Sequence, residues 1–215
     1  MLDDSIASEG YLIKETPRIV DLSAIDFEAL AEKFKKSPTK RAEAEKLKGE
    51  LQQKVENLVM LNRTRMDFLE KFRKMVEDYN QGAYNTEEFY QKLLDFAGEM
   101  TEEEQRHHRL GLSEEELTIF DLLTKPDMQL SGKDEKAVKK VAKELLAKLK
   151  DQQLVLDWKK RQQTKAAVRN TIEEVLDSLP DVYDRKLFAQ KCDKVYLHIY
   201  ESYHGDGRSL YSEVA

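Results

Sequence analysis

The sequence predicts an all-α fold, a multi-helix bundle of mostly antiparallel helices. Apolar residues recur at spacings of three and four along most of the chain, which is the period of a helix with one buried face. No stretch alternates apolar and polar residues for long enough to predict a strand. Charged residues make up 36% of the 215 residues, and only four prolines and eight glycines interrupt them. The predicted connections are mostly short, which favours antiparallel neighbours.

The first half of the chain is predicted to hold a helix that ends near Lys36 and a long charged helix from Pro38 to Leu61. Ser37 supplies a cap, and proline is well tolerated at the first helical position. A break at residues 62–64 separates the long helix from a further helix that Gly82 closes. The long helix and the one after it could project together as an antiparallel hairpin.

Two capping boxes mark the next helix starts. Asn85 is followed three residues later by Glu88, and Ser113 by Glu116. In such a box each side chain satisfies a backbone N–H that the first helical turn leaves free. The second of these helices should stop before Pro126, because the residue before a proline avoids the helical region.

The stretch from 154 to 179 is predicted to organise the chain, as one helix with one apolar stripe. It contains the only tryptophan, Trp158, and the densest basic cluster, which includes Arg161, Lys165 and Arg169. Arg161 and Lys165 occupy positions where the stripe calls for apolar side chains. In one interpretation their stems cover the core and their charged ends reach water. In the other they contact acidic groups or phosphates of a partner.

These patterns divide the chain into three parts. Residues 1–22 carry no helical period and form an extended lead-in. Residues 23–204 form the helical domain, which ends with a helix from about Asp184 to Tyr203. Residues 205–215 are a glycine-punctuated tail that contains Tyr211.

Composition excludes several classes of protein. A net charge of −6 argues against a surface that binds nucleic acid as a whole, because phosphate binding requires a positive field. The single cysteine, Cys192, excludes an internal disulfide and a multi-cysteine zinc site. No segment approaches 18 uninterrupted apolar residues, and the first 20 residues lack a signal-peptide core, so we expect a cytoplasmic protein without membrane contact.

The sequence predicts no catalytic residue, no metal site and no cofactor in this chain. Glu103 with His107, and Glu104 with His108, are helix neighbours, but no third ligand is implied and a solvated charged turn is the preferred interpretation. Gly132-Lys133 lacks the remaining residues of a phosphate-binding loop.

Two further titratable residues are predicted to be structural. His198 should pack beside tyrosines near the apolar face of the last helix. Cys192 lies on the apolar stripe of the same helix and is predicted to be a buried thiol.

Several strings, taken together and in order, resemble the C-terminal region of type I restriction enzyme R subunits. The resemblance runs from about residue 19 to the C-terminus. The strings are IVDLSAIDFEAL (19–30), AEKLKGELQQKVENLVMLNRTRMDFLEKF (44–72), GLSEEELTIFDLLTKP (111–126), VLDWKKRQQTKAAVRNTIEEVLDSLP (155–180) and KCDKVYLHIYESY (191–203).

This resemblance implies a multidomain parent protein. In the family, an N-terminal nuclease domain cuts DNA and two motor domains translocate it with ATP and magnesium. The C-terminal helical region is thought to dock the subunit onto the methyltransferase and specificity subunits. The lead-in would then join the helical domain to motor domains upstream.

The resulting hypothesis is that this chain is a non-catalytic docking fragment which meets DNA only through the full complex. Trp158, Arg161, Lys165 and Arg169 are the candidate contact residues for a partner or for DNA. Two alternatives stay open: a helical module of the same complex that contacts DNA, and an unrelated helical adaptor.

Overall fold

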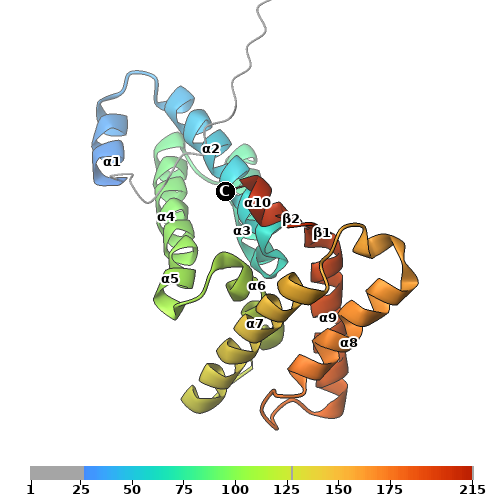
Figure 1. Cartoon of the computed structure of the whole chain (residues 1–215). Coiled ribbons are helices and arrows are strands. Elements are labelled where there is room, and N and C mark those ends of the chain that lie inside the picture. The colour runs from blue at the N-terminus through green and yellow to red at the C-terminus, as the bar shows by residue number, and fades with distance from the viewer. Residues whose placement is uncertain (1–26, 127, 215) are drawn as a thin grey trace, which may run out of the picture.

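The computed structural model describes residues 27–126 and 128–214. The predicted lead-in, 1–22, and the predicted start of the helical domain at residue 23 lie outside the described residues. Figure 1 shows the course of the chain. The elements are α1 (Phe27–Lys36), α2 (Lys40–Leu61), η2 (Arg63–Arg65), α3 (Met66–Asn80), α4 (Thr86–Glu104), α5 (Arg106–Leu110), α6 (Glu114–Thr124), α7 (Gly132–Gln152), η3 (Trp158–Lys160), α8 (Gln162–Leu176), α9 (Arg185–Ser202), β1 (Tyr203–Gly205), β2 (Arg208–Ser209) and α10 (Leu210–Val214).

The all-α prediction is confirmed. In the described part of the chain the strands are limited to β1 and β2, a short antiparallel pair just after α9. Both predicted capping boxes are present, at Asn85 with Glu88 and at Ser113 with Glu116. Gly82 follows α3 in the left-handed conformation at φ 81°. These boundaries are encoded locally, in side chains next to the helix end. Helix α2 differs from its prediction, because it begins at Lys40 after Thr39, which makes no side-chain cap, two residues later than the predicted start at Pro38.

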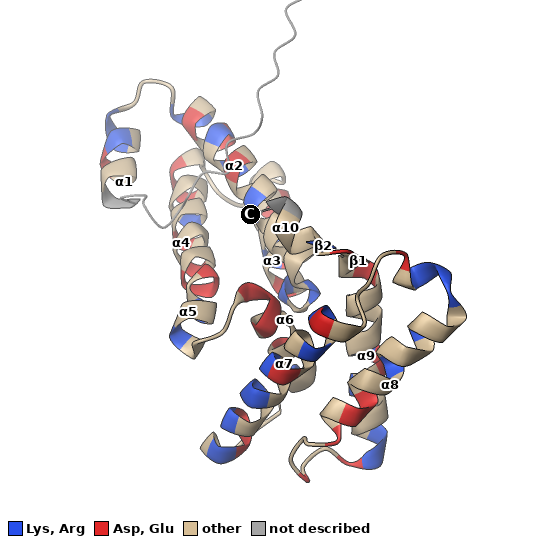
Figure 2. Cartoon of the chain, viewed as in Figure 1, with Lys and Arg blue, Asp and Glu red and all other residues tan. Residues whose placement is uncertain are grey.

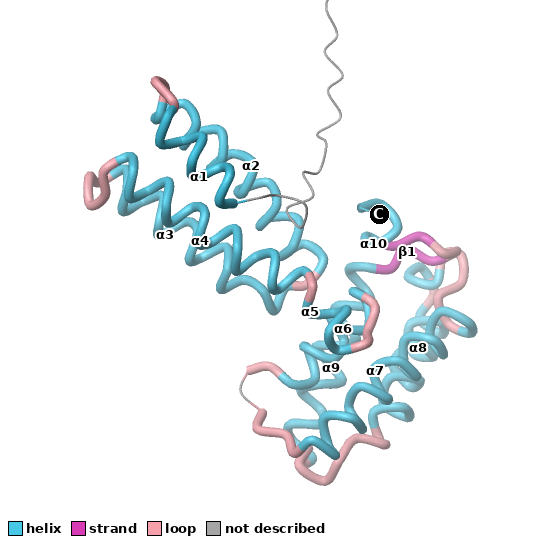
Figure 3. Tube along the Cα trace, turned by 90° about the vertical axis from the view of Figure 1, so that its left-hand side faces the viewer, coloured by secondary structure: helices cyan, strands magenta, loops and turns pink. Residues whose placement is uncertain are grey.

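The helices form two lobes, each with its own apolar core (Figure 3). The N-terminal lobe comprises α1 to α4, where α2 packs against both α3 and α4. Its core runs from Phe34 to Met100 and includes stacked ring pairs, Phe34 on Tyr90 and Tyr79 on Phe89. Because α4 packs along α2, the predicted hairpin of α2 and α3 is part of a larger bundle.

The C-terminal lobe comprises α6 to α10, with α5 connecting it to the N-terminal lobe (Figure 3). In this lobe α7 packs between α6 and α8, and α9 contacts both α6 and α8. Its core runs from Leu112 to Tyr211. The last turns of the chain therefore contribute to the core, since Tyr211 is buried and lies beyond residue 204.

The prediction of one continuous helix through residues 154–179 is wrong. Helix α7 ends at Gln152, and α8 begins only at Gln162; the nine residues between them include the short helix η3. Asp157 has φ 59°, a left-handed conformation that no right-handed helix can contain. The reason is tertiary: the Trp158 indole is fully buried in the C-terminal core, and its Nε1 donates to the Tyr203 carbonyl at 3.3 Å. Anchoring this large side chain there requires the backbone to leave the helix.

Candidate interaction surface

The structure separates the four residues that the sequence singled out. Trp158 is fully buried, so its side chain contributes to the core and is unavailable to a partner. Arg161 is exposed and occupies the extended position just before α8. Lys165 is half-buried on the first turn of α8, and Arg169 is exposed one turn later.

Arg169 is already engaged within the chain. Its guanidinium forms an ion pair with Asp193 of α9, and its Nε donates to Glu173 at 3.3 Å. It also lies over the Tyr196 ring, 5.5 Å from the centroid. The hydrogen bond that Arg169 donates to Asp193 is the largest cause of a raised pKa for Arg169. This residue therefore ties α8 to α9 and has limited freedom to meet a partner.

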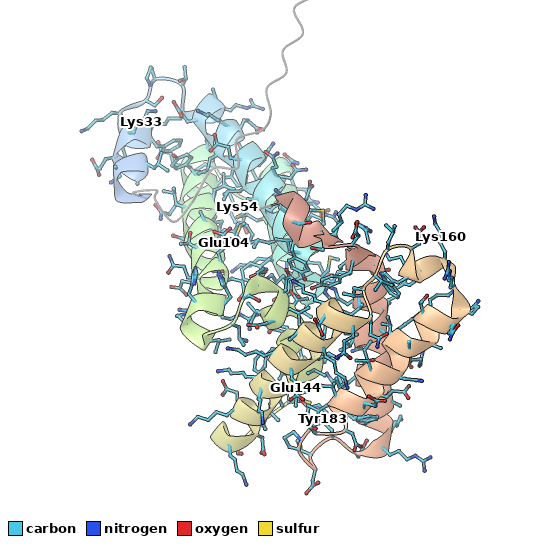
Figure 4. The ribbon with its side chains drawn as sticks, in the orientation of Figure 1. Lys33, Lys54, Glu104, Glu144, Lys160 and Tyr183 are labelled. Atoms are coloured by element: carbon cyan, nitrogen blue, oxygen red, sulfur yellow. The ribbon has the colours of Figure 1, made fainter. Side chains whose placement is uncertain are left out.

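The remaining cations differ in how they are compensated. Lys160 pairs with Asp157 at 2.9 Å, and Figure 4 shows it at the turn before α8. Lys159 lies over the Tyr200 ring at 5.3 Å, and burial lowers its pKa. For Arg161 and Lys165, the described part of the chain offers no ion pair within 4.0 Å. In the described basic cluster, Arg161 is therefore an exposed cation and Lys165 a half-buried one, each without an ion pair.

Exposed apolar side chains surround this turn, and sequence reasoning missed them. Val155 is 50% exposed and Leu156 is 60% exposed, directly before η3. On α9, Leu197 is 52% exposed and Tyr200 is 38% exposed. Tyr200 meets the edge of Trp158, with ring centroids 5.9 Å apart, so the two segments are in contact. We call the surface made by 155–161, Lys165, Leu197 and Tyr200 the η3 corner.

The sequence did hold a signal for this patch. Leu197 falls outside the buried positions of the α9 stripe, and Val155 and Leu156 are adjacent apolar residues that one helix face cannot both bury. The signal was lost because 154–179 was interpreted as a single helix.

A second cluster of charges joins the two lobes, and we call it the lobe junction. The Arg65 side chain is fully buried between Glu103 at the end of α4 and Glu114 at the start of α6. Its Nε lies 2.8 Å from the Glu103 carboxylate. Burial lowers the pKa of Arg65, but the hydrogen bonds that it donates to Glu114 and Glu103 more than offset this effect, and the pKa is raised overall. Figure 2 shows this acidic start of α6 beside α5.

Asp121 of α6 completes the lobe junction. Its carboxylate is fully buried and is bound at both oxygens by the guanidinium of Arg106. Asn62, at the end of α2, donates to the same carboxylate at 2.8 Å. Arg106 also reaches Glu103 at 2.9 Å. The network therefore connects residues from both lobes through groups that are largely withdrawn from water.

The lobe junction corrects the interpretation of 101–109 as a solvated charged turn. The Glu103 side chain is only 12% exposed, and Glu104 forms an ion pair with Lys54 at 2.9 Å, which Figure 4 labels. Sequence reasoning weighed these carboxylates only against metal binding. Among the described residues, no group of three or more His, Cys, Asp or Glu side chains is arranged to hold a metal ion.

The predictions for His198 and Cys192 are confirmed. His198 is buried, within hydrogen-bond distance of Ser202 Oγ and Tyr211 Oη, both at 3.2 Å. Burial lowers its pKa to about 4, with a further contribution from Arg63. Burial raises the pKa of the Cys192 thiol to about 11, which leaves it protonated at neutral pH.

Comparison with known proteins gives a consistent family. The family described as "Type I restriction enzyme HindI endonuclease subunit-like, C-terminal" matches residues 1–201. A protein of Methanocaldococcus jannaschii, described provisionally as the type I restriction enzyme MjaIXP endonuclease subunit, is 31% identical over 110 residues. That match covers 51% of this chain and 10% of the relative, so the chain spans a small part of that relative's length. No solved structure matches the chain. In the part that the structure describes, no helix is long and apolar enough to cross a membrane.

Proposed function

Since the chain belongs to the family of type I restriction enzyme endonuclease subunits, as a C-terminal region, we propose that it is the module that docks such a subunit onto the methyltransferase and specificity subunits. Within this proposal the chain itself is non-catalytic and holds no cofactor. ATP and magnesium serve the motor domains of the parent protein, which cuts and translocates DNA. The whole complex works in the cytoplasm, and the lead-in, 1–22, joins the helical domain to those motor domains.

The observation that carries the proposal is an exposed apolar corner on an otherwise well-packed helical body. Seven large hydrophobic side chains of the described residues are exposed, and four of them lie in the η3 corner. Contiguous exposed apolar side chains on a folded protein mark a surface that another molecule covers. A docking module requires such a surface, together with a body rigid enough to hold it in place.

The test is association of the purified endonuclease subunit with the methyltransferase–specificity complex of its own restriction system. We expect the two to co-elute in gel filtration, and we expect deletion of residues 27–215 to abolish co-elution. A subunit that lacks this region and still co-elutes would contradict the proposal. The same experiment discriminates the unrelated-adaptor alternative, under which the intact subunit would not join the complex.

A direct contact with DNA is the second candidate, and Arg161 and Lys165 favour it, because both carry uncompensated positive charge. This alternative predicts that the chain binds duplex DNA with an affinity that falls steeply with salt. It also predicts loss of binding in the double variant Arg161→Ala with Lys165→Ala. If wild type and double variant bind DNA equally, or neither binds, the DNA alternative fails.

A further inference from the structure

We propose that the η3 corner is the docking face itself, and that its occupant is a protein surface with an apolar centre and carboxylates at its rim. This inference rests on the proposed docking function and adds the face, the anchor residues and the chemistry of the partner. The structural basis is the meeting of two chain segments that are distant in sequence: the turn before α8 and the outer face of α9 (Figure 1).

The apolar centre of the corner is held rigidly. Leu156 lies two residues before Trp158, whose indole is fixed in the core by its bond to the Tyr203 carbonyl. The turn is closed from the other side by the β1–β2 hairpin, since Asp206 N donates to the Leu154 carbonyl at 3.1 Å. Gly205 approaches the same turn so closely that a Cβ there would lie 2.4 Å from the Val155 carbonyl oxygen. A side chain exposed on such a turn loses little conformational entropy when a partner covers it.

The α9 side of the corner presents Tyr200 and Leu197. They are three residues apart and therefore neighbours on the helix surface. The Tyr200 ring contacts both Trp158 and Tyr196, with centroids 5.9 Å and 6.2 Å away, so its position is also fixed. Fixed aromatic side chains with apolar neighbours are typical anchors of protein interfaces.

The charge of the corner predicts an acidic partner. The corner holds four cations, Lys159, Lys160, Arg161 and Lys165, and one carboxylate, Asp157, which leaves a formal excess of three positive charges. The exposed leucines at its centre favour a protein over DNA, because a phosphate backbone offers no apolar surface to cover them, and the chain as a whole carries a net charge of −6. Figure 2 shows a basic stretch at the turn just before α8.

The cations at the rim of the corner favour a partner with negative charge at the matching positions. Arg161 is exposed without a described carboxylate partner, and Lys165 is its neighbour one turn along α8. An arginine in this state can bind a carboxylate through two parallel hydrogen bonds. We therefore expect an acidic side chain of the partner opposite Arg161, at the edge of an apolar contact.

The test uses the intact subunit and apolar-to-acidic changes at matched exposure. Leu156→Asp with Leu197→Asp is the corner variant, and Val182→Asp with Met60→Asp is the control, since those side chains are 48% and 42% exposed elsewhere on the surface. Circular dichroism and thermal unfolding establish that each variant is folded. We expect the corner variant to bind the methyltransferase–specificity complex at least tenfold more weakly in biolayer interferometry, and the control to stay within twofold.

A second arm tests the rim. Arg161→Glu with Lys165→Glu should slow association, with a loss that shrinks as salt rises, because rim charges act mainly on the rate of encounter. If the wild type binds the complex and the corner variant binds equally well, the corner is excluded while the docking function stands. If the wild type does not bind at all, both fail. A third outcome overturns the inference. If the corner variant still binds the protein complex, and the charge variant loses binding to duplex DNA but not to the protein complex, the corner is a DNA contact.

Discussion

Arg65 of the N-terminal lobe and Glu114 of the C-terminal lobe form an ion pair across the lobe junction, with an arginine side chain that is fully withdrawn from water. The two apolar cores are separate clusters, and Leu61 of α2 packs against the C-terminal one, so this pair and its neighbours join the lobes together with that apolar contact. A buried charge is tolerated only when its hydrogen bonds are satisfied, and Arg65 has Glu103 on one side and Glu114 on the other.

Removing the Arg65 charge should destabilise the protein strongly. Arg65→Met leaves Glu114 without its guanidinium partner and Glu103 with Arg106 alone, and breaking a buried pair in this way costs about 3 kcal/mol. The matched control is Lys71→Met, which removes an exposed pair with Glu99 at 2.5 Å and should cost about 0.5 kcal/mol. The free energy of unfolding in urea measures both. Equal losses in the two variants would show that the lobe junction contributes no more than a surface pair.

Trp158 should report a core environment. It is the only tryptophan, so the tryptophan fluorescence of the chain comes from this one indole. Iodide should quench the emission of Trp158 only weakly in the folded protein. It should quench the emission strongly in the protein unfolded by urea. Trp158→Ala should cost about 3–5 kcal/mol, as expected for truncating a fully buried aromatic side chain. Strong iodide quenching of the folded protein would contradict the burial of Trp158 and its exclusion from the docking face.

His198 should make stability depend on pH in acid. Burial lowers the pKa of His198 to about 4 in the folded protein, from its ordinary value of 6.5. The unfolded chain therefore binds the proton more readily between these values, and the free energy of unfolding falls as the pH falls from about 6.5 to about 4. The full difference is about 3 kcal/mol.

The comparison for this pH effect is between two histidine variants. His198→Gln should flatten the pH dependence across that window, whereas the exposed His204→Gln should leave it unchanged. Urea titrations at pH 7 and pH 4.5 suffice. Identical slopes in wild type and His198→Gln would refute the assignment.

Substituting alanine at Gly205 and at Gly207 tests whether Gly205 is needed for the close approach of the backbone to Val155. Both have positive φ, 89° and 73°, which costs an alanine about 1 kcal/mol. Only at Gly205 would a Cβ also collide with the Val155 carbonyl oxygen, at 2.4 Å. Gly205→Ala should therefore lower the free energy of unfolding by clearly more than Gly207→Ala. It should also expose Trp158 to iodide, because the collision pushes the turn before η3 out of place. Indistinguishable unfolding curves for the two variants would argue against this close approach.

The sequence by itself determined the class of fold and those helix ends that have a local capping signal. The capping boxes at Ser113 and Asn85, and the left-handed Gly82, act within one turn of the chain, so neighbouring residues decide them. Family resemblance could likewise be found from short strings in order, and the match over residues 1–201 confirms it. The buried state of Cys192 followed from its place on a helical stripe.

Tertiary structure alone decided the surface and the lobe junction. The period of apolar residues continues through 154–179, but the burial of Trp158 against Tyr203, 45 residues away, breaks the helix and turns Leu156 outward. The sequence predicted a solvated carboxylate at Glu103. In the structure this carboxylate accepts a hydrogen bond from Arg65, which lies 38 residues earlier in the chain. Both outcomes depend on contacts between distant segments, whose energies exceed local helix preference, and no local pattern records which segments will meet.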